Sequence, residues 1–222
     1  GSYSEQASAG IDVYQIRQPL GVVAGITPFN FPAMVPMWMF ANAIMCGNTF
    51  ILKPSEKDPS ASNYLAALLK EAGVPDGVFN VVHGDRIAVD AILAHPDVKA
   101  VSFVGSTPIA KAIYETGTKH GKRVQALGGA KNHMLVLPDA VMDKTAENII
   151  SSAFGAAGQR CMAGSVVVSV AGAWDALKPE LVSRAEKIAV GDGLTPGVGL
   201  GPVVSKQAQA RIIGMIDQAI AD

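Results

Sequence analysis

The feature that most constrains the fold is an alternation of short apolar, β-branched runs with longer segments of helical pattern. Residues 22–26 and 49–53 are typical of buried strands, and the segment between them has the length and composition of a helix. Strands that alternate with helices form βαβ units, in which successive strands pair in parallel. The sequence therefore predicts an α/β fold built around a parallel sheet.

The alternation continues along nearly the whole chain, with Gly, Pro or Asp between the elements. The predicted strands are residues 11–17, 22–26, 49–53, 78–82, 100–104, 123–126, 133–137 and 165–170. The predicted helices are residues 33–45, 59–72, 86–94, 108–119, 144–157, 173–189 and a last one from Lys206. This rhythm is typical of a Rossmann-like open parallel sheet that binds a dinucleotide, followed by part of a second α/β domain. The first strand alternates polar and apolar residues, so one of its faces is expected to be wet.

Charge and apolar content exclude several classes of protein. The chain has 222 residues with a formal net charge of −1, enough length for one large domain or two small ones. A charge so close to zero gives no field for attracting nucleic acid or an anionic membrane, and neither is expected as a partner. Pro36 and Asn42 interrupt the most apolar stretch, so no transmembrane helix is expected. Cys46 and Cys161 make no disulfide framework, which favours a reducing compartment.

Cys161 is the first candidate for chemistry, in the run Gly158-Gln159-Arg160-Cys161-Met162-Ala163. A thiolate is a strong nucleophile near neutral pH, and a neighbouring cation such as Arg160 favours the thiolate form. The alternative is a small buried hydrophobic residue, which is what most free cysteines are. That alternative fits Cys46 better, because Cys46 lies in an apolar helical segment.

Asn30 is the second candidate, in the run Ile26-Thr27-Pro28-Phe29-Asn30-Phe31-Pro32 directly after a predicted strand. Open α/β sheets bind ligands at the carboxyl ends of their strands, where a side-chain amide can donate to an oxyanion. Asn before a helix is equally an ordinary N-cap. Without further information, the N-cap is the favoured interpretation.

Two further turns are candidates for binding a dinucleotide. Gly105-Ser106 leads from a predicted strand into a helix, whose first backbone N–H groups suit a pyrophosphate. Lys53-Pro54-Ser55-Glu56-Lys57 follows another strand, and an acid there can accept from ribose hydroxyls while repelling a 2′-phosphate. Taken alone, the first turn is a common one and the second is an ordinary solvated loop.

In this order along one chain, the four features resemble the aldehyde dehydrogenase superfamily. The resemblance covers the chain from about Ile11 and corresponds to the central part of a family member. It implies a strand arm or linker at residues 1–20, an NAD-binding domain at residues 21–127, and a partial catalytic domain at residues 128–222. A family segment whose Glu contacts the nicotinamide ribose does not occur within these residues.

The resemblance implies a role for each matching residue. Cys161 is the expected nucleophile, and Asn30 and the backbone amide of Cys161 are the expected oxyanion donors. Arg160 is a candidate for binding a substrate carboxylate. The expected NAD-binding residues are Thr27, Phe29, Lys53, Glu56, Lys57, Gly105, Ser106 and Gly128. Ala110 stands where many members have Gly after the Gly-Ser-Thr turn.

A departure at the domain boundary bears on the mechanism. Most hydrolytic members read Glu-Leu-Gly-Gly there, and the Glu activates water, whereas this chain reads Ala126-Leu127-Gly128-Gly129. A methyl group takes no proton, so general-base hydrolysis loses a contribution of about 10²- to 10⁴-fold. Together with Gly129-Ala130-Lys131-Asn132-His133, this run is similar to the coenzyme A-acylating methylmalonate-semialdehyde dehydrogenases.

The resemblance thus implies NAD-dependent oxidation of a small aldehyde, (methyl)malonate semialdehyde, with release of the acyl group by coenzyme A as a co-substrate and with no metal. Two alternatives remain: a hydrolytic aldehyde dehydrogenase that gives a free acid, and a non-catalytic nucleotide-binding fragment. The isolated chain is expected to be inactive, and the full-length protein to be a homo-oligomer. The expected compartment is the cytoplasm in a bacterium or the mitochondrial matrix in a eukaryote.

Overall fold

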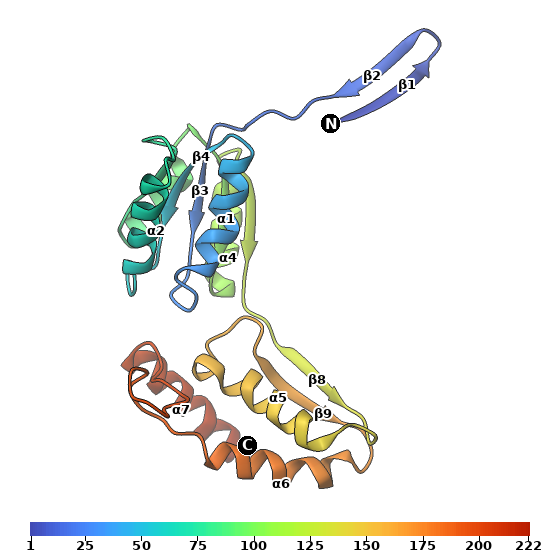
Figure 1. Ribbon diagram of the computed structural model, residues 1–222, viewed down its shortest axis with the longest axis vertical. Helices are drawn as coiled ribbons and strands as arrows, with labels where there is room; N and C mark the ends of the chain where they lie inside the picture. The colour runs from blue at the N-terminus through green and yellow to red at the C-terminus, as the bar shows by residue number, and fades with distance from the viewer. The chain divides into compact units, whose positions relative to one another are not determined.

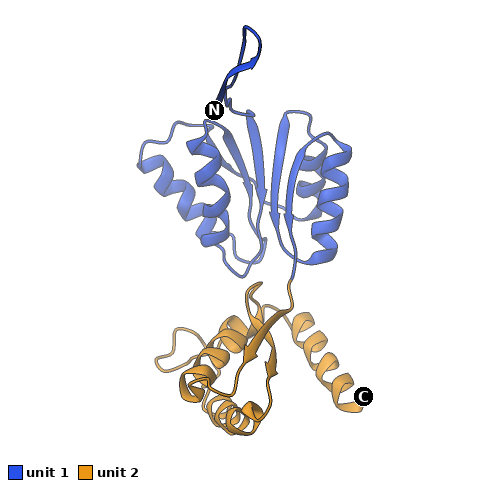
Figure 2. Ribbon diagram, turned by 90° about the vertical axis from the view of Figure 1, so that its right-hand side faces the viewer, with its two compact units in different colours: residues 1–129 blue, residues 130–222 orange.

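The computed structural model describes all 222 residues, which divide into two compact units, residues 1–129 and residues 130–222 (Figure 2). Each unit contains parallel strands and packed helices, so the predicted α/β fold is confirmed. No helix is long and apolar enough to cross a membrane.

The sheet of unit 1 has five parallel strands in the order β5-β4-β3-β6-β7 (Figure 1). They are β3 (Val22–Ile26), β4 (Thr49–Lys53), β5 (Phe79–Val81), β6 (Val98–Val104) and β7 (Arg123–Leu127). The chain moves outward from β3 to β5 and then returns to the other side of β3, so the order reverses between β3 and β6. Ligands of open α/β sheets bind at such a switch point, outside the carboxyl ends of the strands.

Four helices cover the two faces of this sheet, as Figure 2 shows. They are α1 (Met34–Met45), α2 (Ser60–Glu71), α3 (Arg86–Ala94) and α4 (Thr107–Lys119). Alternate residues of each strand face opposite sides. On β3, Val23 packs in the core beneath α1 and α2, while Ala24 packs in the core beneath α3 and α4. Large buried side chains fill both cores: Phe50 in the core beneath α1 and α2, and Phe103 in the core beneath α3 and α4.

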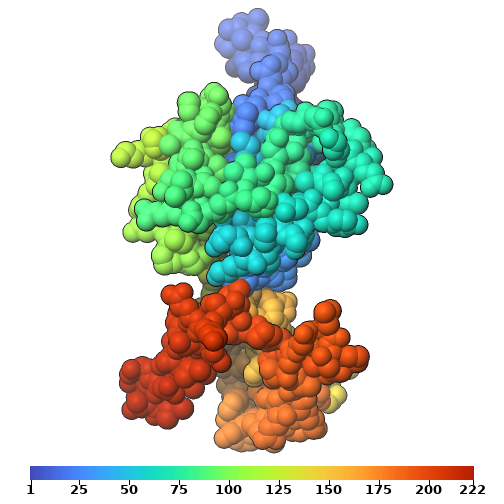
Figure 3. Space-filling view, turned by 90° about the vertical axis from the view of Figure 1, so that its left-hand side faces the viewer, coloured from blue at the N-terminus to red at the C-terminus, as the bar shows by residue number.

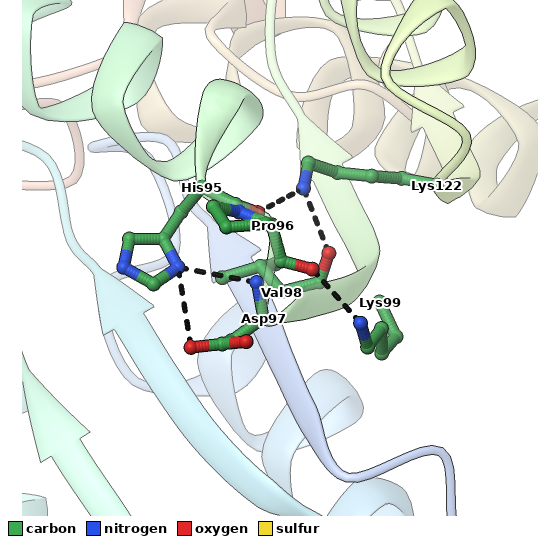
Figure 4. Close-up of polar contacts among 6 residues, drawn as sticks. All are labelled: His95, Pro96, Asp97, Val98, Lys99 and Lys122. Carbon is green, nitrogen blue, oxygen red and sulfur yellow. Dashed lines mark hydrogen bonds and ion pairs between the residues drawn. The ribbon is translucent and has the colours of Figure 1, made fainter.

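A buried lysine ties the amino-terminal ends of β6 and β7 together (Figure 4). Lys122 lies just before β7 and is 6% exposed. Its Nζ donates to the carbonyl oxygens of His95, just after α3, at 2.5 Å and of Val98, the first residue of β6, at 2.7 Å. Burial lowers the pKa of Lys122 below its ordinary value, and the Lys99 charge lowers it further.

The amino-terminal residues form an antiparallel hairpin of β1 (Ser2–Ser8) and β2 (Ile11–Gln15). Sequence analysis predicts β2 but not β1. Every residue of both strands is exposed, including Tyr3, Tyr14 and Val13, so the expectation of only one wet face is wrong for β2. In the space-filling view of Figure 3 the hairpin, in blue, stands clear of the rest of unit 1.

Unit 2 has a two-stranded parallel sheet with helices packed on it (Figure 1). Its elements are β8 (Asn132–Val136), α5 (Met142–Phe154), a 3-10 turn (Gly155–Gly158), β9 (Gly164–Ser169), α6 (Ala173–Glu186) and α7 (Lys206–Ala221). The core lies between the sheet and the pair α5 and α6, and contains Val136, Ile149 and Leu177. Helix α7 buries none of its residues.

Candidate functional site

Thr27 directly follows β3 at the switch point of the unit 1 sheet. Its backbone N–H donates to the carbonyl of Lys53 at 3.1 Å, which continues the ladder between β3 and β4 by one residue. Thr27 is 5% exposed, yet its Oγ1 has no hydrogen-bond partner. Buried hydroxyls are usually hydrogen-bonded, so this one is free to bond to a molecule held at this edge of the sheet.

The loop after β4 brings two lysines and a glutamate together. Lys53 is 4% exposed and its Nζ lies 3.0 Å from Oε2 of Glu56, whose carboxylate is open to solvent. A hydrogen bond from the Glu56 backbone N–H, followed by that from Lys53, lowers the pKa of Glu56. The Nζ of Lys57 lies 5.1 Å from the centre of the Phe29 ring, a cation–π distance that links this loop to the loop after β3.

The turn from β6 into α4 lies on the other side of the switch point. Ser106 is the N-cap residue of α4, but its side chain makes no capping hydrogen bond. The first N–H groups of α4 are therefore left without a side-chain cap, which suits an anion. Gly128 approaches this turn so closely that an added Cβ would lie 2.9 Å from Oγ1 of Thr107. The same Oγ1 accepts from the N–H of Gly129 at 3.0 Å.

Asn30 does not cap helix α1. That helix begins at Met34, and its N-cap residue is Ala33, with no side-chain capping hydrogen bond. The N-cap alternative for Asn30 is therefore wrong. Pro32 lies between Asn30 and the helix and disfavours helical backbone at Phe31, the residue before it. The helix begins one residue after its predicted start at residue 33.

Cys161 follows a turn of unusual backbone in unit 2. Residues Ala156, Ala157 and Gly158 have φ values of 52°, 54° and 74°. The predicted helix 144–157 therefore ends early, at Phe154. Cys161 is a half-buried free thiol. The other cysteine, Cys46, is an exposed free thiol, so the expectation that it is buried is wrong; it lies at the C-terminal end of α1.

Hydrogen bonds made by side chains of β8, α5 and the turn itself hold this turn in place. The Nδ2 of Asn132, at the start of β8, donates to the carbonyls of Cys161 at 2.9 Å and Ala163 at 3.0 Å. Ser152 Oγ of α5 accepts from the N–H of Gly164 at 2.9 Å. Gln159 Oε1 accepts from the N–H of Val204 at 3.0 Å. Hydrogen bonds therefore fix the backbone around Cys161, the candidate nucleophile.

Arg160 packs against Gly155 within the same turn. A Cβ added to Gly155 would lie 2.6 Å from Nη1 of Arg160, so the guanidinium lies directly against the backbone of Gly155. None of the ion pairs in the structure involves Arg160. An arginine that forms no ion pair is available to an anionic substrate.

The predicted site residues fall into two groups. Unit 1 places Thr27, Lys53, Ser106 and their neighbours at the carboxyl ends of its strands and the loops that follow them, while unit 2 holds Cys161 and Arg160 in one turn. The unsatisfied Thr27 hydroxyl and the uncapped α4 fit a dinucleotide with its hydroxyls and phosphates. No group of three or more His, Cys, Asp or Glu side chains is placed to hold a metal ion.

Two residues that contact these groups, Asn132 and Thr107, have no role predicted from the sequence. Each makes a hydrogen bond across more than 20 residues of chain, Asn132 to Cys161 and Thr107 to Gly129. For Asn132, the sequence shows only that a polar residue stands at the first position of an apolar strand. Its partner is not visible from that pattern.

Comparison with known proteins gives a consistent result. The family model described as the aldehyde dehydrogenase family matches residues 2–222. The malonate-semialdehyde dehydrogenase of Pseudomonas aeruginosa is 55% identical over 222 residues, all of this chain and 45% of that protein. The mitochondrial, acylating methylmalonate-semialdehyde dehydrogenase of Arabidopsis thaliana is 54% identical over 100% of this chain and 36% of its own length.

A solved structure from Sinorhizobium meliloti, assigned as methylmalonate-semialdehyde dehydrogenase and complexed with NAD, superposes with a TM-score of 0.95. It is 55% identical and the match covers 99% of this chain and 45% of that one. The chain therefore spans less than half the length of these relatives.

Proposed function

Because this chain belongs to the aldehyde dehydrogenase family, we propose that it forms the NAD⁺-binding and nucleophile-bearing part of a coenzyme A-acylating semialdehyde dehydrogenase. The proposed substrate is a small aldehyde that carries a carboxylate, methylmalonate or malonate semialdehyde. The names of the relatives support this substrate class, and one of those names includes acylation. Since the relatives are more than twice as long, the activity is proposed for a full-length protein, and the 222-residue chain alone is expected to be inactive.

In the proposed mechanism, the thiolate of Cys161 attacks the aldehyde carbon and forms a carbon–sulfur bond. The negative charge moves to the aldehyde oxygen, to which the side-chain amide of Asn30 and the backbone N–H of Cys161 are assigned as donors. Bound NAD⁺ supplies the acceptor for the hydride of that carbon. The acyl group then remains on Cys161 as a thioester.

The residues proposed to hold NAD⁺ are those at the carboxyl edge of the unit 1 sheet. Lys53 and Glu56 are assigned to the adenosine ribose, where the carboxylate accepts from the hydroxyls and disfavours a 2′-phosphate. Gly105 and Ser106 are assigned to the pyrophosphate. Thr27 and Phe29 are assigned to the walls of the cleft, Lys57 to the flank of the ribose site, and Gly128 to the nicotinamide end.

The observation that carries the acylating proposal is Ala126. This residue lies in β7, partly buried against the apolar core beneath α3 and α4, at the position where hydrolytic family members carry their base. An alanine cannot deprotonate water, whereas a thiol such as coenzyme A is a competent nucleophile without that base. Coenzyme A therefore attacks the thioester, Cys161 leaves as thiolate, and an acyl-coenzyme A is formed.

For a carboxylated substrate, we propose that the carbon–carbon bond to the carboxylate of the thioester breaks. Carbon dioxide leaves and is hydrated to bicarbonate, and the electron pair left on the α-carbon takes up a proton from water. Methylmalonate semialdehyde then gives propionyl-coenzyme A, and malonate semialdehyde gives acetyl-coenzyme A. We assign Arg160 to the substrate carboxylate, because it adjoins Cys161 and forms no ion pair. Arg160→Ala in the full-length protein is expected to raise KM for malonate semialdehyde and leave KM for propanal unchanged; equal changes for both aldehydes would refute the assignment.

NADH formation by the full-length protein tests the proposal. Without coenzyme A, the account predicts one equivalent of NADH per Cys161 followed by a stall, because the thioester has no acceptor. Addition of coenzyme A restarts the reaction. Continuous NADH formation without coenzyme A would favour the hydrolytic alternative, and NAD⁺ binding without any NADH would favour a non-catalytic nucleotide-binding protein.

We also propose that the exposed β1–β2 hairpin pairs copies of the full-length protein in a homo-oligomer. A two-stranded hairpin is marginally stable by itself, and this one exposes Tyr3, Ile11 and Tyr14. Exposed apolar side chains on such a hairpin are suited to burial in a subunit interface. Sedimentation of a full-length protein with Tyr3→Asp and Tyr14→Asp is expected to show smaller species than the parent; unchanged sedimentation would refute this role.

A further inference from the structure

We propose that Asn132 is a positioning residue, whose carboxamide holds the backbone of Cys161 in the conformation that presents its thiol to the substrate. This inference rests on the proposed role of Cys161 as nucleophile. It concerns contacts within unit 2 alone, and its principal test needs no enzymatic activity.

The contact is a double hydrogen bond from one side chain. Asn132 is the first residue of β8 and pairs in register with Gly164, the first residue of β9. The ladder is irregular between Asn132 and His133. At this point the Nδ2 of Asn132 donates to the carbonyls of Cys161 and Ala163, at 2.9 Å and 3.0 Å. A single NH₂ group has two donors, so both are used.

The strained backbone before Cys161 explains why the hydrogen bonds from Asn132 are needed. Ala156 and Ala157 both have a left-handed backbone, which costs a non-glycine residue about 1–2 kcal/mol. Strained conformations of this kind persist only when the surrounding structure over-determines them. Ser152 and Gln159 fasten neighbouring residues of the turn, but Asn132 binds the carbonyl of Cys161 itself.

The consequence for the proposed chemistry follows from the geometry of the peptide. Fixing the carbonyl of Cys161 fixes the peptide plane on its C-terminal side and limits the directions that its Cα–Cβ bond can take. A displacement of about 1 Å at a reacting group can lower a rate by about 10²-fold. Loss of the tie is therefore expected to lower kcat without changing the NAD⁺ site, whose proposed residues belong to unit 1.

The test measures the reactivity of Cys161 in the 222-residue chain. Cys46→Ser leaves Cys161 as its one thiol, since the sequence has two cysteines. The rate of alkylation by iodoacetamide is measured in native buffer and in guanidinium, with and without Asn132→Leu, and circular dichroism gives the folded fraction. If Asn132→Leu does not fold, the same measurements are made on Asn132→Ser, which is a smaller change.

Asn80→Leu is the matched control in unit 1. The Nδ2 of Asn80 also donates to two carbonyls, those of Phe50 at 3.4 Å and Gly77 at 2.8 Å. We expect Asn132→Leu to shift the native alkylation rate at least fivefold toward the rate in guanidinium, and Asn80→Leu to leave it within twofold of the parent. A rate within twofold of the parent for the folded Asn132 variant, or an equal shift from Asn80→Leu, would overturn the proposal.

Kinetics of the full-length protein give the second measurement. Asn132→Leu is expected to lower kcat by about 10- to 100-fold and to leave KM for NAD⁺ within twofold. Unchanged kcat would overturn the positioning role. If the full-length parent oxidised no aldehyde, the proposed function would fail, while the alkylation result would still show whether Asn132 orders the Cys161 turn.

Discussion

Replacing Thr27 with valine separates the stability of unit 1 from its proposed cofactor binding. Thr27 is 5% exposed and its hydroxyl has no partner. Valine keeps the branched shape and substitutes a methyl group for the hydroxyl. The substitution is therefore expected to stabilise the free protein and to weaken its binding of NAD⁺, two effects of opposite sign from one atom.

The sizes of both effects follow from the hydroxyl. Burying one without a hydrogen bond costs about 1–3 kcal/mol, so Thr27→Val is expected to raise the free energy of unfolding by about 1–2 kcal/mol. With a urea m-value of about 2 kcal/mol/M, the midpoint of unfolding rises by about 0.5–1 M. A hydrogen bond to the bound cofactor is worth about 0.5–1.5 kcal/mol, so Kd for NAD⁺ rises by about 2- to 10-fold.

Urea unfolding followed by tryptophan fluorescence measures the first effect. The two tryptophans lie in different units, Trp38 in α1 and Trp174 in α6, so Trp174→Phe makes the signal report unit 1 alone. Calorimetric titration with NAD⁺ on the full-length protein measures the second. A Thr27→Val protein that is less stable than its parent, or that binds NAD⁺ with unchanged affinity, would refute the reasoning.

Three further substitutions test other contacts. Lys122→Met removes two hydrogen bonds of a buried ammonium group. It is expected to lower the free energy of unfolding of unit 1 by about 2–3 kcal/mol in the same urea assay. A loss below about 0.5 kcal/mol would show that these hydrogen bonds do not stabilise unit 1. Burial raises the pKa of Asp58, so the native state binds the proton of this carboxyl more tightly than the unfolded state does. The free energy of unfolding therefore falls as the pH rises from the ordinary pKa of 3.8 through the raised pKa. Urea unfolding between pH 4 and 7 should show this fall in the parent and not in Asp58→Asn, and the same pH dependence in both proteins would contradict it. Ala126→Glu restores the family's base in a full-length protein and should increase free-acid release without coenzyme A by about 10-fold or more, measured by chromatography; an unchanged product would argue against the role of Ala126.

Apart from β1, the strands and helices of unit 1 could be predicted within one or two residues because each has a strong local signal. Runs such as Val22–Ile26 and Thr49–Lys53 are apolar and β-branched, and glycines or prolines separate them from the helices. Strand β1 lacks this signal, since Ser2–Ser8 is mostly polar and buries no side chain. Its conformation depends on pairing with β2, which no local pattern shows.

The turn before Cys161 shows where local preference fails. Alanine favours helix, so the sequence predicts that the helix continues through Ala156 and Ala157, whereas both adopt left-handed backbone. Asn132 and Val204, both distant in the chain, form hydrogen bonds with Cys161 and Gln159 just after these alanines, and a local pattern shows no such contacts. The candidate residues themselves were found because their types and order match a family, not because the sequence shows their geometry.

Product identification by mass spectrometry tests the central claim most directly. The full-length protein is given NAD⁺ and methylmalonate semialdehyde, with and without coenzyme A, and Cys161→Ala is the control. The account predicts propionyl-coenzyme A only when coenzyme A is present, and no product from the Cys161 variant. Free acid formed at the same rate without coenzyme A would contradict it, because water would then be activated by a group other than the residue at position 126.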